Sequence, residues 1–96
     1  MTTTLNGATG TERKIRDMVL SIVRLLVDYP EDVEVAQLSN LEGSVFCIRV
    51  HPHDVGKLIG NGGQIERALR CVVLASGRKL GHRLTIDIAQ ESRGLR

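Results

Sequence analysis

The chain has 96 residues, of which 42% are hydrophobic and 25% charged, so it is long enough for one small globular domain and no more. Its formal net charge of +2 does not by itself identify a binding partner. No apolar run reaches the roughly 18 residues of a membrane span, and residues 1–11 lack the basic flank and apolar core of a signal peptide. We therefore expect a cytoplasmic protein that does not insert into a membrane.

The first predicted helix covers residues 12–29 and follows a polar tail that we expect to be disordered. Thr11 is a suitable N-cap, and Pro30 ends the helix. Leu20 and Val27 lie off its apolar face, so we expect them to be either isolated exposed side chains or contacts with another subunit. The apolar face consists of residues at three- and four-residue spacing: Ile15, Met18, Val19, Ile22, Leu25, Leu26 and Tyr29.

Two strands are predicted next, over residues 33–38 and 44–50, with turn-forming residues between them. A short connection between such strands indicates a hairpin. Asp54 is then a suitable N-cap for a brief helix over residues 55–59.

A third helix is predicted over residues 63–79 and a third strand over residues 84–88, joined by a basic connection over residues 77–83. Polar residues 91–96 form a loose tail, so the folded domain is expected over residues 12–90. The third helix has two faces: Ile65, Ala68, Leu69, Val72 and Ser76 form the predicted inner face, and Gly63, Arg67, Arg70 and Arg78 fall on the opposite side.

Residues 60–63 read Gly-Asn-Gly-Gly and connect the second predicted helix to the third. Glycines permit positive φ and leave room for a ligand near the peptide N–H groups, and the next helix presents its positive end there, so the loop is suited to phosphate. The Gly-Lys-Ser/Thr ending of a Walker loop is missing, and Ile65 stands where a dinucleotide fingerprint has its third glycine. The remaining G-x-x-G pattern, with Arg67 and Arg70 after it, favours the nucleic-acid clamp of a KH domain over a plain turn.

The charges are divided unevenly along the chain. Residues 1–48 contain four basic and seven acidic residues, whereas residues 49–83 contain seven basic and two acidic ones. The positive charge is therefore concentrated in the segment that carries the glycine loop, which supports a polyanionic partner.

Cysteine and histidine do not predict a disulfide or a metal site. Cys47 and Cys71 fall in separate apolar elements, without a partner at ligand spacing, and we expect two buried, reduced thiols. His51 and His53 lie around a proline, and His82 lies in a different connection. We expect no metal and no cofactor.

The order of the elements, together with the sequence VGKLIGNGGQIERALR, resembles the small stand-alone bacterial KH proteins of the KhpA type over about residues 15–89. The resemblance implies an α+β fold, the type II KH domain (α-β-β-α-α-β), in which three helices cover one face of a three-stranded mixed sheet. It implies non-catalytic binding of single-stranded RNA by an RNA chaperone or post-transcriptional regulator, with no small-molecule substrate. It also implies a homodimer, or a heterodimer with a larger KH-domain protein.

The resemblance also assigns the site. The groove would lie between the two helices joined by the glycine loop and the strand over residues 83–88, with residues 77–82 as a variable loop. Many family members carry a lysine inside the glycine loop, where this chain has Asn61 and Gly62, so we expect modest affinity that depends on backbone N–H groups. The predicted RNA-binding residues are the clamp Gly60, Asn61, Gly62 and Gly63, the flanking Lys57 and Arg67, the groove-floor Ile59, and the further cations Arg70, Arg78, Lys79 and Arg83.

Two other functions are compatible with these patterns. A KH-fold module that binds only protein would tolerate substitutions in the glycine loop but not at Leu20 or Leu74. An enzyme could use the loop as a phosphate cradle, but only Asp54, His51 and His53 lie near it in sequence, and they form no nucleophile–base pair. We therefore expect no catalysis.

Overall fold

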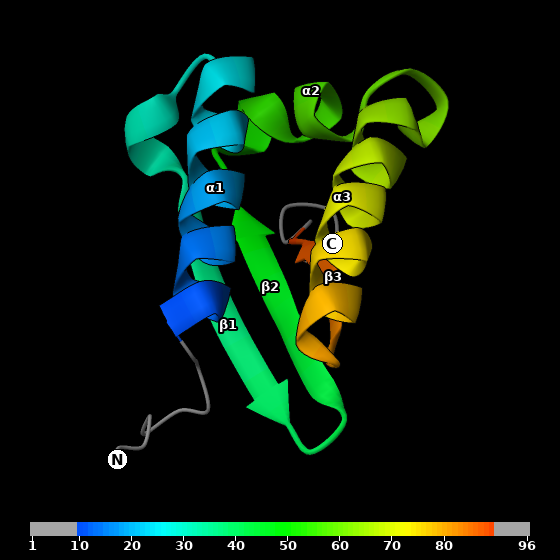
Figure 1. Cartoon of the computed structure of the whole chain (residues 1–96). Helices are drawn as coiled ribbons and strands as arrows, with labels where there is room; N and C mark the ends of the chain where they lie inside the picture. Colours follow the sequence, from blue (N-terminus) through cyan, green and yellow to red (C-terminus); the bar gives the residue numbers. More distant parts are fainter. Residues whose placement is uncertain (1–9, 90–96) are drawn as a thin grey trace.

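The computed structural model describes residues 10–89 of the chain. Figure 1 shows two long helices packed on a sheet, with a short helix crossing between their ends. Within the described residues the helices are α1 (Gly10–Leu26), α2 (Val55–Ile59) and α3 (Gln64–Leu80), the strands are β1 (Glu34–Asn40), β2 (Gly43–Arg49) and β3 (Arg83–Ile88), and the 3-10 turns are η1 (Pro30–Asp32), η2 (Pro52–Asp54) and η3 (Asn61–Gly63).

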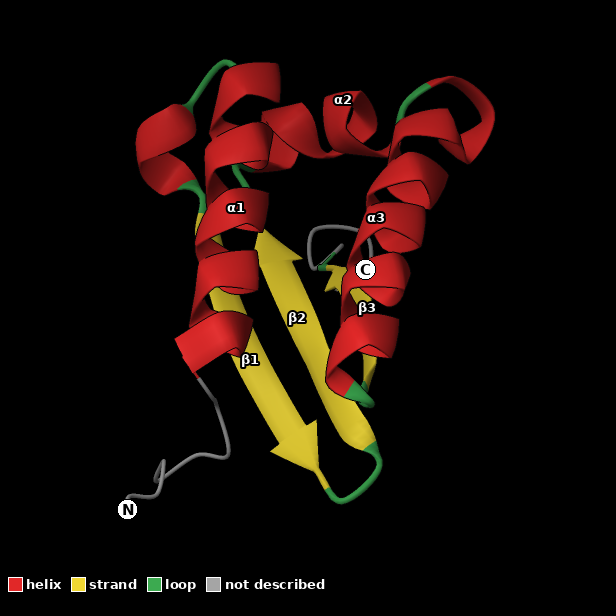
Figure 2. Cartoon of the chain, in the orientation of Figure 1, coloured by secondary structure: helices red, strands yellow, loops and turns green. Residues whose placement is uncertain are grey.

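The sheet is mixed, with strand order β1-β2-β3. The β1–β2 pair is antiparallel and places Leu38 opposite Val45, whereas β2 and β3 run parallel with Phe46 opposite Ile86. Figure 2 shows the helices on one face of this sheet. The α+β fold and the α-β-β-α-α-β order expected from the sequence are therefore confirmed.

The core lies between the sheet and the helices. Alternation along β2 and β3 turns every second side chain toward the helices, and each fully buried aliphatic or aromatic side chain stabilises the fold by about 1.5–3 kcal/mol. The fully buried apolar side chains are Val19, Val23, Phe46, Ile48, Leu58, Val73 and Leu84.

The first helix differs from its prediction in its ends and in its buried face. It ends at Leu26 because the buried Asp54 carboxylate accepts hydrogen bonds from the N–H groups of Asp28 (3.1 Å) and Tyr29 (3.0 Å), which turns the chain before Pro30. It begins at Gly10, so Thr11 lies inside its first turn and is not the N-cap. The predicted apolar face is confirmed at Ile15, Met18, Val19 and Ile22, which are buried or pack against the core. It is wrong at its end, where Leu25 is 86% exposed, and it missed the buried Glu12 and Val23 and the packing of Leu20 and Val27 against the core.

The third helix also presents a different face to the core. Leu69, Val73 and Gly77 are buried, whereas Ala68 and Val72 of the predicted inner face are exposed. The reason lies at Gly77, where a Cβ would come within 2.6 Å of the His82 carbonyl oxygen. The missing side chain lets α3 rest directly on the start of β3.

The expected variable loop over residues 77–82 is wrong, because α3 continues to Leu80 and only Gly81 and His82 separate it from β3. Gly81 ends the helix with φ 71°, and the His82 N–H donates to the Gly77 carbonyl over 2.9 Å.

The two cysteines also differ from their prediction. Cys71 is exposed and Cys47 is only half-buried, so the expectation of two buried thiols is wrong, although both thiols are free. No helix among residues 10–89 has the length and apolarity needed to cross a membrane. Most of the two predicted tails, residues 1–9 and 91–96, lies outside the described residues.

Candidate nucleic-acid interface

The glycine loop, residues 60–63, turns the chain from α2 into α3. Gly60, Gly62 and Gly63 all have positive φ, of 82°, 64° and 79°. A Cβ on Gly60 would lie 2.8 Å from the backbone nitrogen of Ile65, whereas no atom lies within 4 Å of the Cβ position of Gly62. Glycine is therefore required for close packing at position 60, and at position 62 for backbone conformation alone.

The tip of the loop carries free hydrogen-bond donors. The N–H of Gly60 donates to the Gly56 carbonyl (2.9 Å) and that of Gly63 to the Gly60 carbonyl (3.2 Å). The N–H groups of Asn61 and Gly62 have no acceptor among residues 10–89. Gly63, the N-cap of α3, offers no side chain to satisfy the first turn, so the positive end of a 17-residue helix lies open beside these two donors.

Arg67 fixes the loop from the first turns of α3. Its Nη1 donates to the Gly62 carbonyl oxygen over 2.7 Å, and its side chain is exposed. The Gly62 carbonyl is thus covered by a cation, while the N–H groups of Asn61 and Gly62 have no acceptor within residues 10–89. This combination suits an anion.

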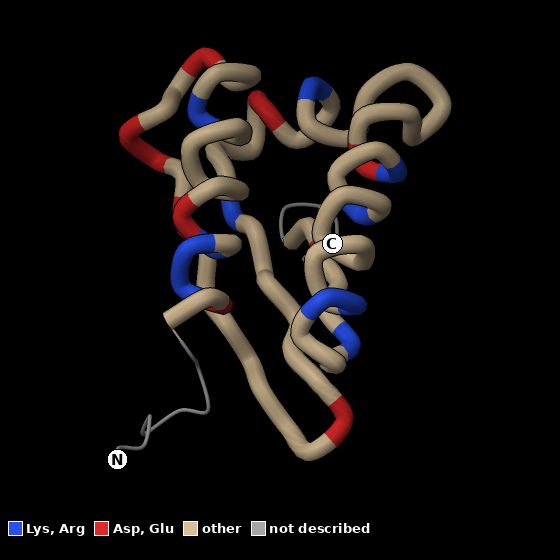
Figure 3. The backbone as a smooth tube through the Cα atoms, in the orientation of Figure 1, with Lys and Arg blue, Asp and Glu red and all other residues tan. Residues whose placement is uncertain are grey.

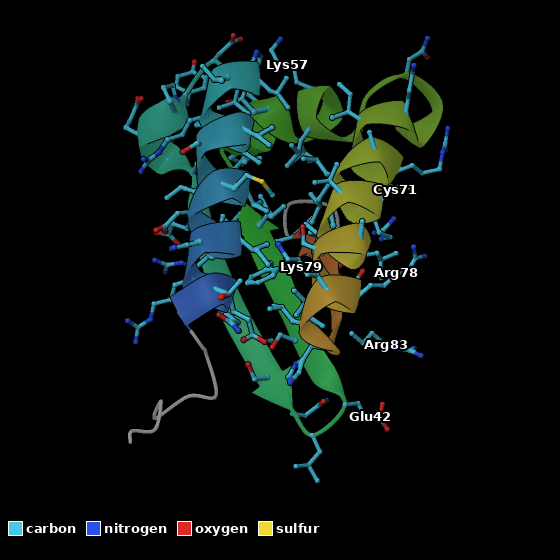
Figure 4. All side chains as sticks on the ribbon, viewed as in Figure 1. Glu42, Lys57, Cys71, Arg78, Lys79 and Arg83 are labelled. Carbon is cyan, nitrogen blue, oxygen red and sulfur yellow. The ribbon has the colours of Figure 1, made fainter. Side chains whose placement is uncertain are left out.

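Lys57 and Ile59 reach the loop less directly than expected. The Lys57 Nζ lies 3.4 Å from an Asp28 carboxylate oxygen, and Figure 4 shows this side chain near the end of α1. Ile59 and Ile65 are partly buried against the core. These isoleucines anchor the two helices on either side of the loop.

Arg78 and Arg83 are brought together at the other end of α3. They line an open groove of ≈ 580 Å³, the basic groove, together with Leu74, Gly81, His82 and Thr85. Neither arginine forms an ion pair with any residue in the described part of the chain. In Figure 4 both project on the same side, whereas Lys79 lies on the side of α3 that faces α1, because consecutive helical residues are about 100° apart. Lys79 is therefore separated from its predicted partner.

Arg70 is the most constrained of the predicted cations. Its Nη2 lies 3.1 Å from a Glu66 carboxylate oxygen and 3.4 Å from the Ile86 carbonyl oxygen on β3. The side chains of Arg70 and Glu66 are only 34% and 25% exposed. Sequence reasoning missed Glu66, although its position four residues before Arg70 on a helix is the usual spacing of an ion pair.

A second residue that sequence reasoning missed is His82. Its Nδ1 lies 3.2 Å from an oxygen of Glu12, a carboxylate that is only 1% exposed and that also accepts from the Gln37 amide (2.7 Å). This contact ties the α3–β3 connection to the first turn of α1. No short-range pattern marks it, because the two residues lie 70 positions apart.

Several basic residues follow α3 across the molecule. Figure 3 shows blue segments along α3 and at the start of β3, and others on α1 and α2, while most red segments gather around α1 and the turns after it. The line runs from the donor-rich glycine loop past Arg70 to the basic groove, which is the surface expected for a phosphate-bearing chain.

Asp54, His51 and His53, the candidate residues near the loop in sequence, take part in structural contacts. Asp54 is fully buried on two backbone N–H groups, and His51 stacks on Tyr29 with ring centroids 4.1 Å apart. The His51 Nδ1 accepts from the His53 N–H at 3.0 Å. Among residues 10–89, no three His, Cys, Asp or Glu side chains are arranged to hold a metal ion.

Comparison with known proteins identifies similar sequences. The family model described as KhpA/KhpB, KH domain matches residues 16–88. The RNA-binding protein KhpA of Oceanobacillus iheyensis is 40% identical over 74 residues, which cover 77% of this chain and 99% of that protein. The proteins of the same name from Aquifex aeolicus and Streptomyces coelicolor are 37% and 45% identical, over 79% and 70% of this chain and 96% and 81% of their own lengths. No solved structure matched the chain.

Proposed function

The chain belongs to the KhpA/KhpB family of KH domains, and we propose that it binds single-stranded RNA and catalyses no reaction. The observation that carries this proposal is the pair of free N–H groups at Asn61 and Gly62, beside the open end of α3 and the Arg67 guanidinium. Backbone donors of this kind bind phosphate oxygens in any nucleotide sequence.

The proposed path of the RNA runs from the glycine loop along α3 and β3 to the basic groove. Arg78 and Arg83 would contact phosphates there, since both are exposed and free of ion pairs within residues 10–89. Lys57 contributes less, because Asp28 already compensates its charge. The RNA would be contacted in the cytoplasm, by a protein acting as an RNA chaperone or post-transcriptional regulator.

We place the contact with a second subunit on the apolar α1–α3 patch, defined as Leu25, Leu26, Val72, Ile22, Ile65 and Ala68. Leu25 is 86% exposed and Val72 is 46% exposed. Val72 lines a groove of ≈ 560 Å³ between the helices, together with Ile22, Leu26, Ile65 and Ala68. Exposed apolar surface of this kind favours protein contact. A homodimer would join two weak RNA sites and raise the apparent affinity. A larger KH-domain partner could occupy the same patch.

The decisive test changes the charge of the loop at Asn61, which is exposed and makes no side-chain hydrogen bond within residues 10–89. Asn61→Asp preserves the shape and should weaken binding of an eight-nucleotide RNA about tenfold in fluorescence anisotropy, whereas Asn61→Lys should strengthen it by a similar factor. Both effects should shrink as salt rises. Equal RNA affinities of the wild type, Asn61→Asp and Asn61→Lys would contradict the proposal that the loop clamps phosphate. If the wild type binds no RNA and Val72→Glu disrupts a protein complex, the alternative of a protein-binding assembly module would be favoured.

A further inference from the structure

The strand β1 lies at one edge of the sheet, and its backbone orientation follows from the ladder between β2 and β3. The Ala89 N–H donates to the Ile48 carbonyl over 2.9 Å, so the backbone groups of Ile48 point toward β3. Successive residues of a strand direct these groups to opposite sides, and those of Arg49 therefore point toward β1. Arg49 is paired there with Glu34, whose own groups point back toward β2.

Three residues of β1 consequently direct their backbone groups away from the sheet. Val35, Gln37 and Ser39 alternate with the residues that are bonded to β2, so their N–H and C=O groups point outward. No backbone or side-chain group among residues 10–89 forms a hydrogen bond with these outward groups. An extended segment laid along β1 would pair with all of them, as a fourth strand does.

The edge of β1 also lacks the features that usually keep a strand from pairing with another chain, which are charges, prolines and bulges. Residues 35–40 contain no charged residue and no proline, and the pairing of β1 with β2 is continuous over its 7 residues. The opposite edge of the sheet differs. There β3 carries Arg83 and Asp87, and Arg70 donates to the Ile86 carbonyl oxygen over 3.4 Å. Of the two edges, β1 is therefore the one open to a further strand.

The side chains beside this edge are apolar on both faces of the sheet. On the face without helices, Leu38 is 63% exposed and Ala36 is exposed as well. On the helix face, Leu20 is only partly buried and lies about 160° around α1 from Ile22. Because Ile22 lines the groove toward α3, Leu20 lies on the flank of α1 turned away from α3, which is the β1 side of the sheet in Figure 1. Apolar side chains of an added strand would find contacts on both faces.

The charges at the start of β1 indicate what the end of such a segment carries. Glu31 and Asp32 of η1 and Glu34 of β1 are all exposed, and Figure 1 shows η1 on the side of α1 away from α3. Arg49 lies opposite Glu34 on β2, so carboxylates predominate among these four residues. A basic side chain is favoured next to them. Antiparallel pairing, the more stable kind, places the C-terminal end of an added strand at this position.

We propose that β1 binds an extended segment of another protein as a fourth, antiparallel strand. The segment has β-branched residues in its middle, which pack beside Leu38, Ala36 and Leu20, and a lysine or arginine at its C-terminal end beside Glu34. This interface goes beyond the proposed function, since the proposed RNA path follows α3 and β3, and β2 separates β3 from β1. The protein can therefore hold RNA and the partner segment together.

The test adds a synthetic peptide to the full chain and follows amide hydrogen exchange by NMR. The peptide is acetyl-Thr-Thr-Val-Thr-Val-Val-Lys-amide, whose lysine lies opposite Glu34 when the peptide pairs antiparallel along the whole of β1. In the free protein the outward amides of Val35, Gln37 and Ser39 should exchange rapidly, because they have no acceptor within residues 10–89. Peptide at about 1 mM should slow the exchange of these three amides about tenfold.

Ser39 offers a matched pair of variants. Ser39→Ala and Ser39→Pro both remove the hydroxyl contacts with Gln37 and Ser44, but only proline also removes the outward N–H and places its ring at the edge. Ser39→Ala should bind the peptide within about twofold of wild type, and Ser39→Pro about tenfold more weakly. A peptide that ends in glutamate instead of lysine should bind wild type about threefold more weakly. Both variants should retain the RNA affinity of wild type within about twofold.

Several results would overturn this interface. The outward amides of wild type could keep their exchange rates when the peptide is added, or Ser39→Pro could bind the peptide as tightly as Ser39→Ala does. Without peptide, protection of these amides that grows with protein concentration would show that a second copy occupies the edge, and protection at every concentration would show that the chain itself covers it. If Ser39→Pro does not fold by circular dichroism, a peptide N-methylated at its central threonine takes its place. That peptide lacks the N–H that faces Gln37, and wild type should bind it about tenfold more weakly than the unmethylated peptide. Equal binding of the two peptides would contradict the proposal.

Discussion

The Arg67 guanidinium donates to the Gly62 carbonyl oxygen across 2.7 Å, so the cation that follows the glycine loop also fixes its conformation. A loop with three glycines has many accessible backbone conformations, and ordering it on RNA binding would reduce the affinity. The contact removes part of this cost in advance. The RNA-binding role proposed for Arg67 therefore has two parts, its charge and its effect on the loop conformation.

These two effects can be separated by substitution. Arg67→Lys retains the charge but cannot reproduce the planar geometry, whereas Arg67→Gln loses the charge. We expect Arg67→Gln to weaken RNA binding about tenfold and to reduce the slope of log affinity against log salt by about 0.7. Arg67→Lys should keep the slope yet bind less tightly than wild type, with faster relaxation of the Asn61 and Gly62 amides in NMR. If the Asn61 and Gly62 amides relax in Arg67→Gln as they do in the wild type, Arg67 does not fix the conformation of the loop.

Gly62 allows a matched pair of substitutions. Its Cβ position is open, and Asn and Asp tolerate φ near +64° better than other side chains do. Gly62→Asn and Gly62→Asp should therefore be destabilised to a similar extent, by about 1 kcal/mol. Only Gly62→Asp should lose most RNA binding, because its carboxylate faces the phosphate. Equal loss in both variants would indicate that backbone conformation, and not charge, controls the site.

Gly77 and Gly56 provide a stability test of helix packing. Gly77→Ala places a Cβ 2.6 Å from the His82 carbonyl oxygen and 2.9 Å from Leu84, and should destabilise the protein by about 2 kcal/mol in urea unfolding. Gly56→Ala in α2 meets no atom within 4 Å and should be neutral or stabilising by up to about 1 kcal/mol. A Gly77→Ala variant as stable as wild type would mean that α3 can move away from β3 at little cost.

Asp54 should contribute to stability and not to RNA binding. Asp54→Ala leaves the N–H groups of Asp28 and Tyr29 without their carboxylate acceptor, and we expect a loss of about 3 kcal/mol in the free energy of unfolding. Asp17→Ala, at an exposed residue that within residues 10–89 pairs only with Arg16, is the control and should change stability by less than about 0.5 kcal/mol. If folded Asp54→Ala binds RNA with wild-type affinity, Asp54 does not take part in RNA binding.

The α1–α3 patch predicts how subunits associate. Val72→Glu places a charge on the patch, and it should convert an associated species to monomers in light scattering without lowering the melting temperature by more than about 3 °C. Leu41→Glu, at an exposed residue of the β1–β2 turn, is the control and should leave the mass of the associated species unchanged. A dimer that survives Val72→Glu would place the contact elsewhere.

The fold could be predicted from strong local patterns in the sequence. The prediction failed where contacts between residues distant in sequence determine the packing. The order of helices and strands followed from periodicity, and α2 was predicted with its observed ends. The C-terminal end of α1 was misplaced because Asp54, distant in sequence, holds the turn that follows the helix. The inner face of α3 was misassigned because the close approach of Gly77 to His82 and Leu84 depends on tertiary packing. The charged residues of the candidate site were predicted by type and position, but their contacts with Glu66, Gly62 and Asp28 depend on three-dimensional placement.

The two-residue connection of Gly81 and His82 has a kinetic consequence. In a binding site with a long loop, the loop must close over the ligand and reopen before release, which slows both steps. Here the end of the groove is built from a helix terminus and the start of a strand, and His82 is tied to buried Glu12. We expect RNA to enter and leave at rates close to those of diffusional encounter, with short residence times on each strand. We expect a protein with such rates to sample many transcripts in succession instead of remaining on one.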